Sequence, residues 1–132
     1  MKYVKIFIAG IAFPSTILPF FLLIAGFLGK TQIYPIPLLH FIPIIWGVWN
    51  ILYFSSFSKI IPGNSTIKLL ITGAVLGLLV ATYGVFVVDI PQLVGFSKSL
   101  TYFPLIAVPL IYALFWLFIV NPLNHLLGIY EK

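Results

Sequence analysis

The sequence of 132 residues contains no cysteine, no arginine and only two acidic residues. The absence of cysteine excludes disulfides, thiolate metal sites and thiol redox chemistry. The two carboxylates are Asp89 and Glu131, and Glu131 is next to the last residue, which excludes paired-carboxylate catalysis and dinuclear metal sites. No catalytic, metal or cofactor motif stands out, so we expect no cofactor, no metal and no enzymatic activity.

Charged side chains of both signs are scarce. They make up 7% of the sequence, against roughly 25% in a soluble domain, whereas hydrophobic residues reach 62%. A soluble fold could not cover its surface with so few charges, but a lipid bilayer requires no polar face. The net charge of +5 comes from lysines scattered between apolar stretches, which favours anchoring at a membrane surface and argues against nucleic-acid binding.

Four apolar stretches are each long enough to cross the ~30 Å hydrocarbon core of a bilayer as an α-helix, which takes ~20 residues. They cover about residues 6–28, 36–57, 68–88 and 100–120, and no formal charge lies in their interiors. The sequence therefore predicts an all-α integral membrane protein, a four-transmembrane-helix bundle that forms one membrane domain over residues 1–132. The polar run Asn64-Ser65-Thr66 is predicted to cap the third helix.

The lysines are distributed unequally between the two ends of this bundle. One end carries Lys2, Lys5, Lys59, Lys68 and Lys132. The other end carries Lys30, Lys98 and the carboxylate of Asp89. Short loops obey the positive-inside rule, so we expect the lysine-rich end, with both termini, to be cytoplasmic. The absence of arginine fits an AT-rich bacterial genome, and we expect a multi-pass protein of the bacterial inner (plasma) membrane.

The second and fourth spans resemble each other. Residues 34–39 resemble residues 101–106, and residues 43–49 resemble residues 109–115 after one residue of slippage. Both segments contain an aromatic residue, two prolines and an aromatic–small–aliphatic–aromatic run in the same order. One interpretation is a 2+2 internal duplication, in which two hairpins are related by an axis along the membrane normal. The other is chance similarity between apolar sequences.

Prolines are dense inside the spans: Pro14, Pro19, Pro43, Pro104 and Pro109. Each leaves the carbonyl four residues earlier without its helical donor, and in lipid that carbonyl needs another partner. Ser15 and Thr16 are placed to help in the first span. We therefore expect proline-kinked helices that shape packing, or broken helices whose free carbonyls bind a cation or substrate near the midplane.

Small residues form a stripe on the third span, at Gly73, Gly77, Ala81 and Gly84. Such a stripe lets two helix backbones approach closely. The partner is either another span of this chain or a second copy of it. We expect a homo-oligomer or a subunit of a larger membrane complex, with the lipid bilayer as the surrounding solvent.

The second span carries the best candidate for a lined cavity. Trp46, Trp49, Asn50 and Tyr53 recur at helical spacing and share one face. An amide in lipid must be hydrogen-bonded, so this face should point into the bundle. Aromatic walls with one amide suit a flat or cationic ligand, and Ser15 and Thr16 are candidates for the same site. The alternative is that the aromatics pack and Asn50 bridges two helices.

Polar residues also gather at the two ends of the bundle. Lys30, His40, Asp89 and Lys98 are predicted to form an outer polar cluster. A His40–Asp89 pair could sense pH, relay protons or serve an interfacial enzyme, although a lone histidine can also be structural. At the other end the fourth helix is predicted to break at Asn121-Pro122, and Asn121, Asn124 and His125 share a face that forms its polar exit.

Three functions follow from these features. A helix-packing protein, as a homo-oligomer or subunit, needs the fewest assumptions. A small oligomeric transporter or channel for a neutral or cationic solute would use the Trp46 face. A membrane-interface enzyme would depend on His40 and Asp89 alone.

Overall fold

The computed structural model describes residues 1–130, and all of the regular structure in that part is helical. Its four long helical segments are Lys2–Phe27, Pro37–Ile60, Ser65–Phe86 and Pro104–Leu126. Each is long and apolar enough to cross a membrane. The expected all-α fold and the number of candidate spans are therefore confirmed, whereas the expectations placed on Glu131 and Lys132 lie outside the described residues.

The first and third segments are single helices, α1 (Lys2–Phe27) and α4 (Ser65–Phe86). The second consists of α2 (Pro37–Leu52), a π-helical turn (Tyr53–Phe57) and α3 (Ser58–Ile60). The fourth consists of α6 (Pro104–Phe115), a second π-helical turn (Trp116–Val120) and α7 (Asn121–Leu126). Short helices connect them: η1 (Thr31–Ile33), α5 (Ile90–Leu93) and η3 (Lys98–Leu100).

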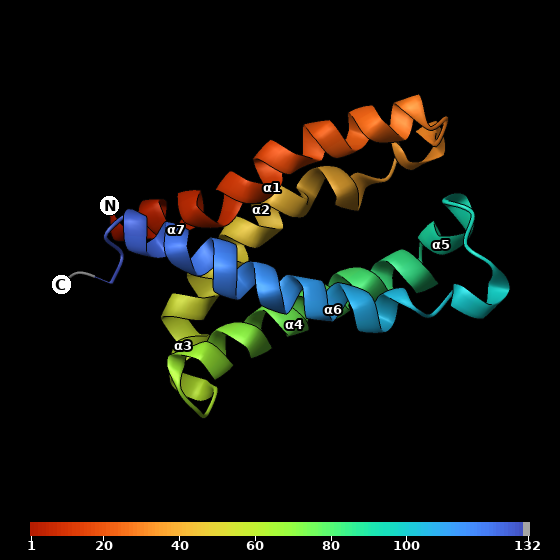
Figure 1. Cartoon of the computed structure of the whole chain (residues 1–132). Helices are drawn as coiled ribbons and strands as arrows, with labels where there is room; N and C mark the ends of the chain where they lie inside the picture. The colour runs from red at the N-terminus through yellow and green to blue at the C-terminus, as the bar shows by residue number, and fades with distance from the viewer. Residues whose placement is uncertain (131–132) are drawn as a thin grey trace.

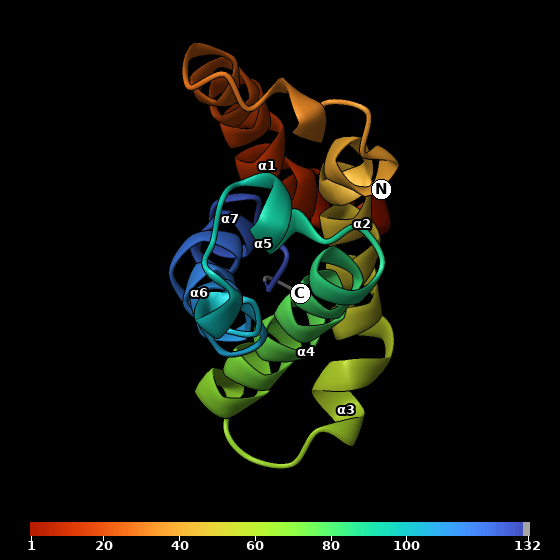
Figure 2. The same cartoon turned by 90° about the vertical axis from the view of Figure 1, so that its right-hand side faces the viewer.

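The four segments form two hairpins, because α1 packs mainly against α2 and α4 mainly against α6 (Figure 1). The tips of both hairpins lie at one end of the molecule, and the N-terminus and α7 lie at the other. Figure 2 looks along the bundle from the tips and shows the hairpins side by side. Near the tips the α1–α2 hairpin diverges from the α4–α6 hairpin (Figure 1).

Glycines bring the helices of each hairpin into close contact. A Cβ on Gly10 would lie 2.7 Å from the Trp46 carbonyl oxygen and 2.8 Å from Gly47 Cα. On α4, a Cβ on Gly73 would lie 2.8 Å from Ala113 Cα, and one on Gly77 would meet the backbone of α6 equally closely. Gly73 and Gly77 of the predicted stripe thus pack on another helix of the same chain, whereas Gly84 faces Ile90 of α5.

The prolines inside the spans do not interrupt the helices. α1 continues through Pro14 and Pro19, and α2 continues through Pro43. Pro104 is the first residue of α6, where its missing N–H would have no helical partner in any case. The helices are therefore continuous at these prolines and are not broken, which was one of the two expectations.

The fourth span ends later than the sequence predicted, because helical structure runs through Pro122 to Leu126. In the π-helical turn before this proline, the Asn121 N–H donates to the Trp116 carbonyl, five residues back. This wider turn relieves the clash that a proline ring makes with the carbonyl four residues earlier. The predicted cap of α4 is observed, since Asn64 Oδ1 accepts from the Ile67 N–H at 2.9 Å.

The main core joins the two hairpins. It is built around Trp46 and Trp116, whose ring centroids are 5.3 Å apart, with Tyr53, Leu69, Leu76 and Val120. A separate small cluster joins the hairpin tips, where Ala25, Ile33 and Ile36 pack against residues of α5.

Candidate functional site

A pair of amides forms the polar centre of the bundle. Asn50 and Asn124 are both fully buried. Asn50 Nδ2 donates to Asn124 Oδ1 at 2.8 Å and to the Ile6 carbonyl at 2.7 Å, and Asn124 Nδ2 donates back to Asn50 Oδ1 at 3.2 Å. These bonds join α1, α2 and α7.

Both protons of the Asn50 amide are therefore used within the chain, and its oxygen already accepts a bond. A solute in contact with this face would have to displace Asn124 or the Ile6 carbonyl. The inward orientation expected for Asn50 is observed. Asn124 is not part of a polar exit, and that prediction was wrong because the helix was expected to end before Pro122.

The other predicted cavity residues divide between the core and the α2–α4 contact. Tyr53 and Trp46 are buried in the core. Trp49 Nε1 donates to the Thr72 carbonyl at 3.0 Å, and the Thr72 hydroxyl donates to the Lys68 carbonyl at 2.7 Å. The indole of Trp49 thus links α2 to α4.

Two indole N–H groups in the core have no hydrogen-bond partner among residues 1–130. Nε1 of Trp46 and Nε1 of Trp116 are both buried among apolar and aromatic side chains. A buried donor without a partner carries a desolvation cost of about 1–3 kcal/mol. Sequence reasoning missed Trp116, because the segment that matched the Trp46 motif ended at residue 115.

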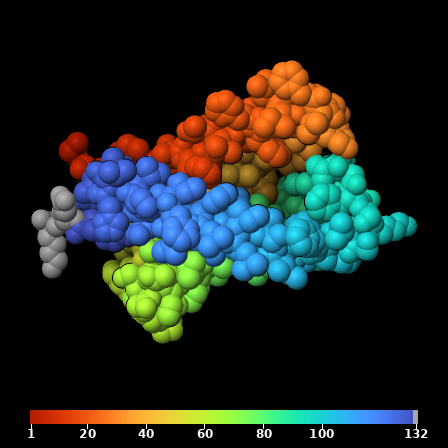
Figure 3. Space-filling model, in the orientation of Figure 1, coloured from red at the N-terminus to blue at the C-terminus, as the bar shows by residue number. Residues whose placement is uncertain are grey.

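An apolar pocket lies between the two hairpins, and we call it the interhairpin fissure. Its volume is about 340 Å³. Its lining residues are Phe13, Pro14, Ile17, Leu18 and Phe21 of α1, Leu39, Ile42 and Trp46 of α2, and Tyr112 and Phe115 of α6. Figure 3 shows the face on which α1 borders α6, with α2 behind the gap between them. Apart from the hydroxyl of Tyr112 and the indole N–H of Trp46, no polar side-chain group occurs among the lining residues.

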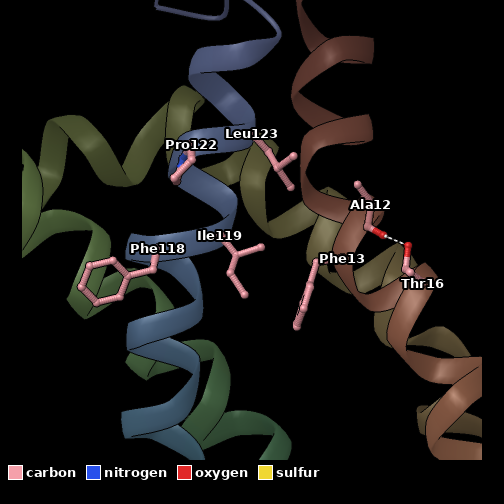
Figure 4. A pocket seen from close by; sticks show the side chains of 7 residues that line it. All are labelled: Ala12, Phe13, Thr16, Phe118, Ile119, Pro122 and Leu123. Atoms are coloured by element: carbon pink, nitrogen blue, oxygen red, sulfur yellow. Dashed lines mark hydrogen bonds between the residues drawn. The ribbon is translucent and has the colours of Figure 1, made fainter.

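A second pocket continues along the same side towards the termini, and we call it the α1–α7 groove. It has a volume of about 420 Å³ and is lined by Ala12, Phe13, Thr16, Phe118, Ile119, Pro122 and Leu123 (Figure 4). Phe13 belongs to both pockets. The Thr16 hydroxyl donates to the Ala12 carbonyl at 2.8 Å, so the groove offers no free polar side chain. Thr16 therefore does not serve a carbonyl freed by proline, and Ser15 is exposed on the outside of α1.

The hairpin tips hold the residues of the predicted outer cluster. The His40 ring nitrogen Nε2 lies 2.7 Å from the Tyr34 carbonyl oxygen, which requires that Nε2 carries the proton. In the part of the chain that the structure describes, His40 thus pairs with the backbone of its own hairpin and not with Asp89. Lys30 Nζ lies beside Gly95, and Gln32 Nε2 donates to the Leu93 carbonyl at 2.9 Å, which ties the two tips together.

Asp89 has a structural role at its position. Its φ of 55° and ψ of 41° place it in the left-handed region, where it precedes α5. Aspartate is among the few residues that adopt this conformation readily. No group of three or more His, Cys, Asp or Glu side chains within residues 1–130 could hold a metal ion.

The segment after α7 folds back onto the first hairpin. Gly128 has φ 64°, and the Ile129 N–H donates to the Asn124 carbonyl at 3.0 Å, which forms a Schellman motif. Ile129 is buried against Ile6 and Ala9 of α1. Beside it, the Tyr130 hydroxyl donates to Asn121 at 2.8 Å; the side chain is 40% exposed, and its partial burial, together with the neighbouring Tyr53, raises the pKa of Tyr130 to about 12.

Comparisons with protein-family models, with curated proteins and with solved structures give no match to this chain. The function must therefore be argued from the geometry.

Proposed function

We propose that the chain crosses a bacterial inner membrane four times, with both termini in the cytoplasm. Four helices have the required length and composition. Lys2 and Lys5 begin α1 at the end where α7 lies, whereas Lys30 and Lys98 lie at the hairpin tips (Figure 1). This asymmetry supports a cytoplasmic location for the termini.

The absence of native cysteine makes this orientation easy to test. Pro62→Cys lies in the loop between the hairpins, and Ser97→Cys lies near a hairpin tip; both positions are exposed. In intact spheroplasts a membrane-impermeant maleimide should label the Ser97→Cys protein and spare the Pro62→Cys protein. The reverse pattern would show that the termini face outwards.

We further propose that the chain acts by packing against other membrane proteins, as a homo-oligomer or as a subunit. The observation that carries this proposal concerns the polar groups of the bundle. The polar side chains of the buried residues Asn50, Thr72 and Asn124 all form hydrogen bonds to other residues of this chain. Few groups are thus left for chemistry, while the outer surface keeps apolar concave pockets.

The interhairpin fissure is the proposed docking site for the partner. Helices associate in lipid through van der Waals contact, so a concave apolar surface gains most from a helix that fills it. The walls formed by Ile17, Phe21 and Phe115 can receive the side chains of one helix. The glycine stripe of α4 is not available for this purpose, because α6 already covers Gly73 and Gly77.

Single cysteines test this docking site. Ile17→Cys lies in the fissure, whereas Leu110→Cys lies on an exposed part of α6 outside it. In native membranes an oxidant or a short bis-maleimide should link the Ile17→Cys protein into one discrete dimer or heteromer and leave the Leu110→Cys protein monomeric. If both variants stay monomeric, and a lipid-soluble maleimide modifies both at the same rate, the fissure has no protein partner.

A second candidate function is the binding or transport of a lipophilic solute in the same fissure. The observation that favours it is the buried Nε1–H of Trp46, a fissure residue: among residues 1–130 it makes no hydrogen bond of good geometry, although the Tyr112 hydroxyl lies near it, and a carbonyl oxygen of a solute would give it an acceptor. A site built on Asn50 is disfavoured, because its amide is already bonded. Saturable quenching of tryptophan fluorescence by a quinone, lost in Trp46→Phe, would support this candidate; unsaturable quenching in both proteins would remove it.

We also propose that the two hairpins descend from an internal duplication. Gly47 and Ala113 correspond to each other in the two similar segments. Each lies where the helices of its hairpin approach each other closely: Gly47 contacts Gly10, and Ala113 contacts Gly73. Both second helices also contain a π-helical turn. An experimental structure in which the hairpins superpose with Gly47 on Ala113 would support the duplication, and a different register would refute it.

A further inference from the structure

Two lysines of α1 lie between the α1–α7 groove and the end of the molecule that holds the N-terminus. Lys5 is exposed, and its Nζ donates to the Leu127 carbonyl at 3.2 Å, so the ammonium group spans the space between α1 and the end of α7. This bond uses one of the three ammonium protons and leaves two for an external acceptor. Lys2 lies one turn earlier on the same helix.

Lys5 shares a helix face with the groove. Ala12 and Thr16 follow it by seven and eleven residues, and at about 100° per residue they fall within about 20° of its direction. At 1.5 Å per residue, Ala12 lies about 10 Å deeper along the helix than Lys5. A phosphate at Lys5 would therefore stand at the membrane surface, directly above the mouth of an apolar groove.

The groove itself matches a hydrocarbon chain. Its walls are apolar, because the Thr16 hydroxyl is bonded to its own helix (Figure 4). Leu126, which is 80% exposed, follows Pro122 by one turn of α7. An extended acyl chain can lie along the groove between Phe118 and Leu123.

Charge indicates which lipid the groove takes. The only carboxylate among residues 1–130 is Asp89, at the opposite end of the molecule, so nothing among the described residues near Lys2 and Lys5 neutralises their charge. Lysines at a membrane surface attract anionic headgroups. We propose that the α1–α7 groove binds one anionic phospholipid of the bilayer, with its phosphate at Lys5 and one acyl chain between α1 and α7.

Native mass spectrometry can count bound lipids on the detergent-purified protein. The probes are phosphatidylglycerol and phosphatidylcholine with identical acyl chains. Wild-type protein should retain one phosphatidylglycerol in preference to phosphatidylcholine. Lys5→Gln should lower phosphatidylglycerol affinity about five-fold, as expected for one lysine near a membrane surface, and leave phosphatidylcholine unchanged. Lys59→Gln, which removes an exposed lysine of α3, is the matched control and should change neither.

Groove-filling variants test the acyl chain separately. Ala12→Leu and Ile119→Trp should each weaken both lipids, with circular dichroism and the melting temperature showing that the bundle remains folded. Equal affinity for both lipids in the wild type, or an equal loss in Lys59→Gln, would overturn the headgroup assignment. Unchanged binding in both filled variants would overturn the assignment of the groove. These outcomes do not depend on a protein partner in the fissure.

Discussion

Replacing Asn50 by leucine tests the buried amide pair most directly. The substitution removes three hydrogen bonds, two donated by Asn50 and one returned by Asn124. Interhelical side-chain bonds in membranes average about 0.6 kcal/mol, which gives about 2 kcal/mol for three. The Asn124 amide is then buried without a partner, at a further cost of about 1–3 kcal/mol. We expect Asn50→Leu to lower the free energy of unfolding by about 3–5 kcal/mol.

The assay is reversible unfolding in mixed micelles with increasing sodium dodecyl sulfate, followed by circular dichroism. Asn50→Leu/Asn124→Leu should lose less than the sum of the two single variants, because neither amide is left unpaired in it. Thr82→Val is the control, since the exposed Thr82 hydroxyl bonds only to Leu78 of its own helix, and it should change stability by less than about 0.5 kcal/mol. Additive losses in the double variant, or a loss in Asn50→Leu no larger than in Thr82→Val, would refute the reasoning.

Three further predictions follow from the backbone and from Tyr130. Gly73→Ala should destabilise the bundle by about 1–3 kcal/mol, because the added Cβ meets the backbone of α6. In Gly84→Ala the added Cβ meets only the end of the Ile90 side chain, so the loss should be less than half as large. Unfolding in detergent measures both losses. Asp89→Gly should raise stability by up to about 1 kcal/mol and Asp89→Val should lower it, because φ is 55°; an opposite order in melting temperature would show that the carboxylate itself matters. The absorbance of phenolate at high pH, compared between the wild type and Tyr130→Phe, should show Tyr130 titrating near its folded pKa of about 12. The neutral phenol stabilises the fold fully below its ordinary pKa of 10.0, and this contribution should fall as the pH rises from 10 to 12. A midpoint near 10 would mean that the folded protein does not shield the phenol from water.

The sequence predicted the spans well because each is a long apolar stretch without an interior charge, and this property depends on no other part of the chain. The predicted end of the fourth span was wrong because a proline normally ends a helix. Here a π-helical turn at Trp116–Val120 widens the helix before Pro122, and no residue type marks such a turn. The same error placed Asn124 outside the bundle.

The residues of the candidate site were likewise predicted only in part from the sequence. The inward direction of Asn50 followed from the cost of an amide in lipid, but its partner lies 74 residues away, and helix order cannot be read from hydropathy. The stripe with Gly73 was recognised, yet both alternatives for its partner were physically acceptable. The fissure and the groove depend on how the two hairpins diverge, and no periodicity in the sequence encodes that angle.

The fold-back of the C-terminal segment also constrains the order of assembly. Asn124, Leu127 and Ile129 are synthesised after the first hairpin, and they contact Asn50, Lys5 and Ile6 of that hairpin. The first hairpin is therefore synthesised before the residue that completes the hydrogen bonds of the Asn50 amide. A polypeptide that stops before Asn124 would leave the Asn50 amide bonded to the Ile6 carbonyl alone.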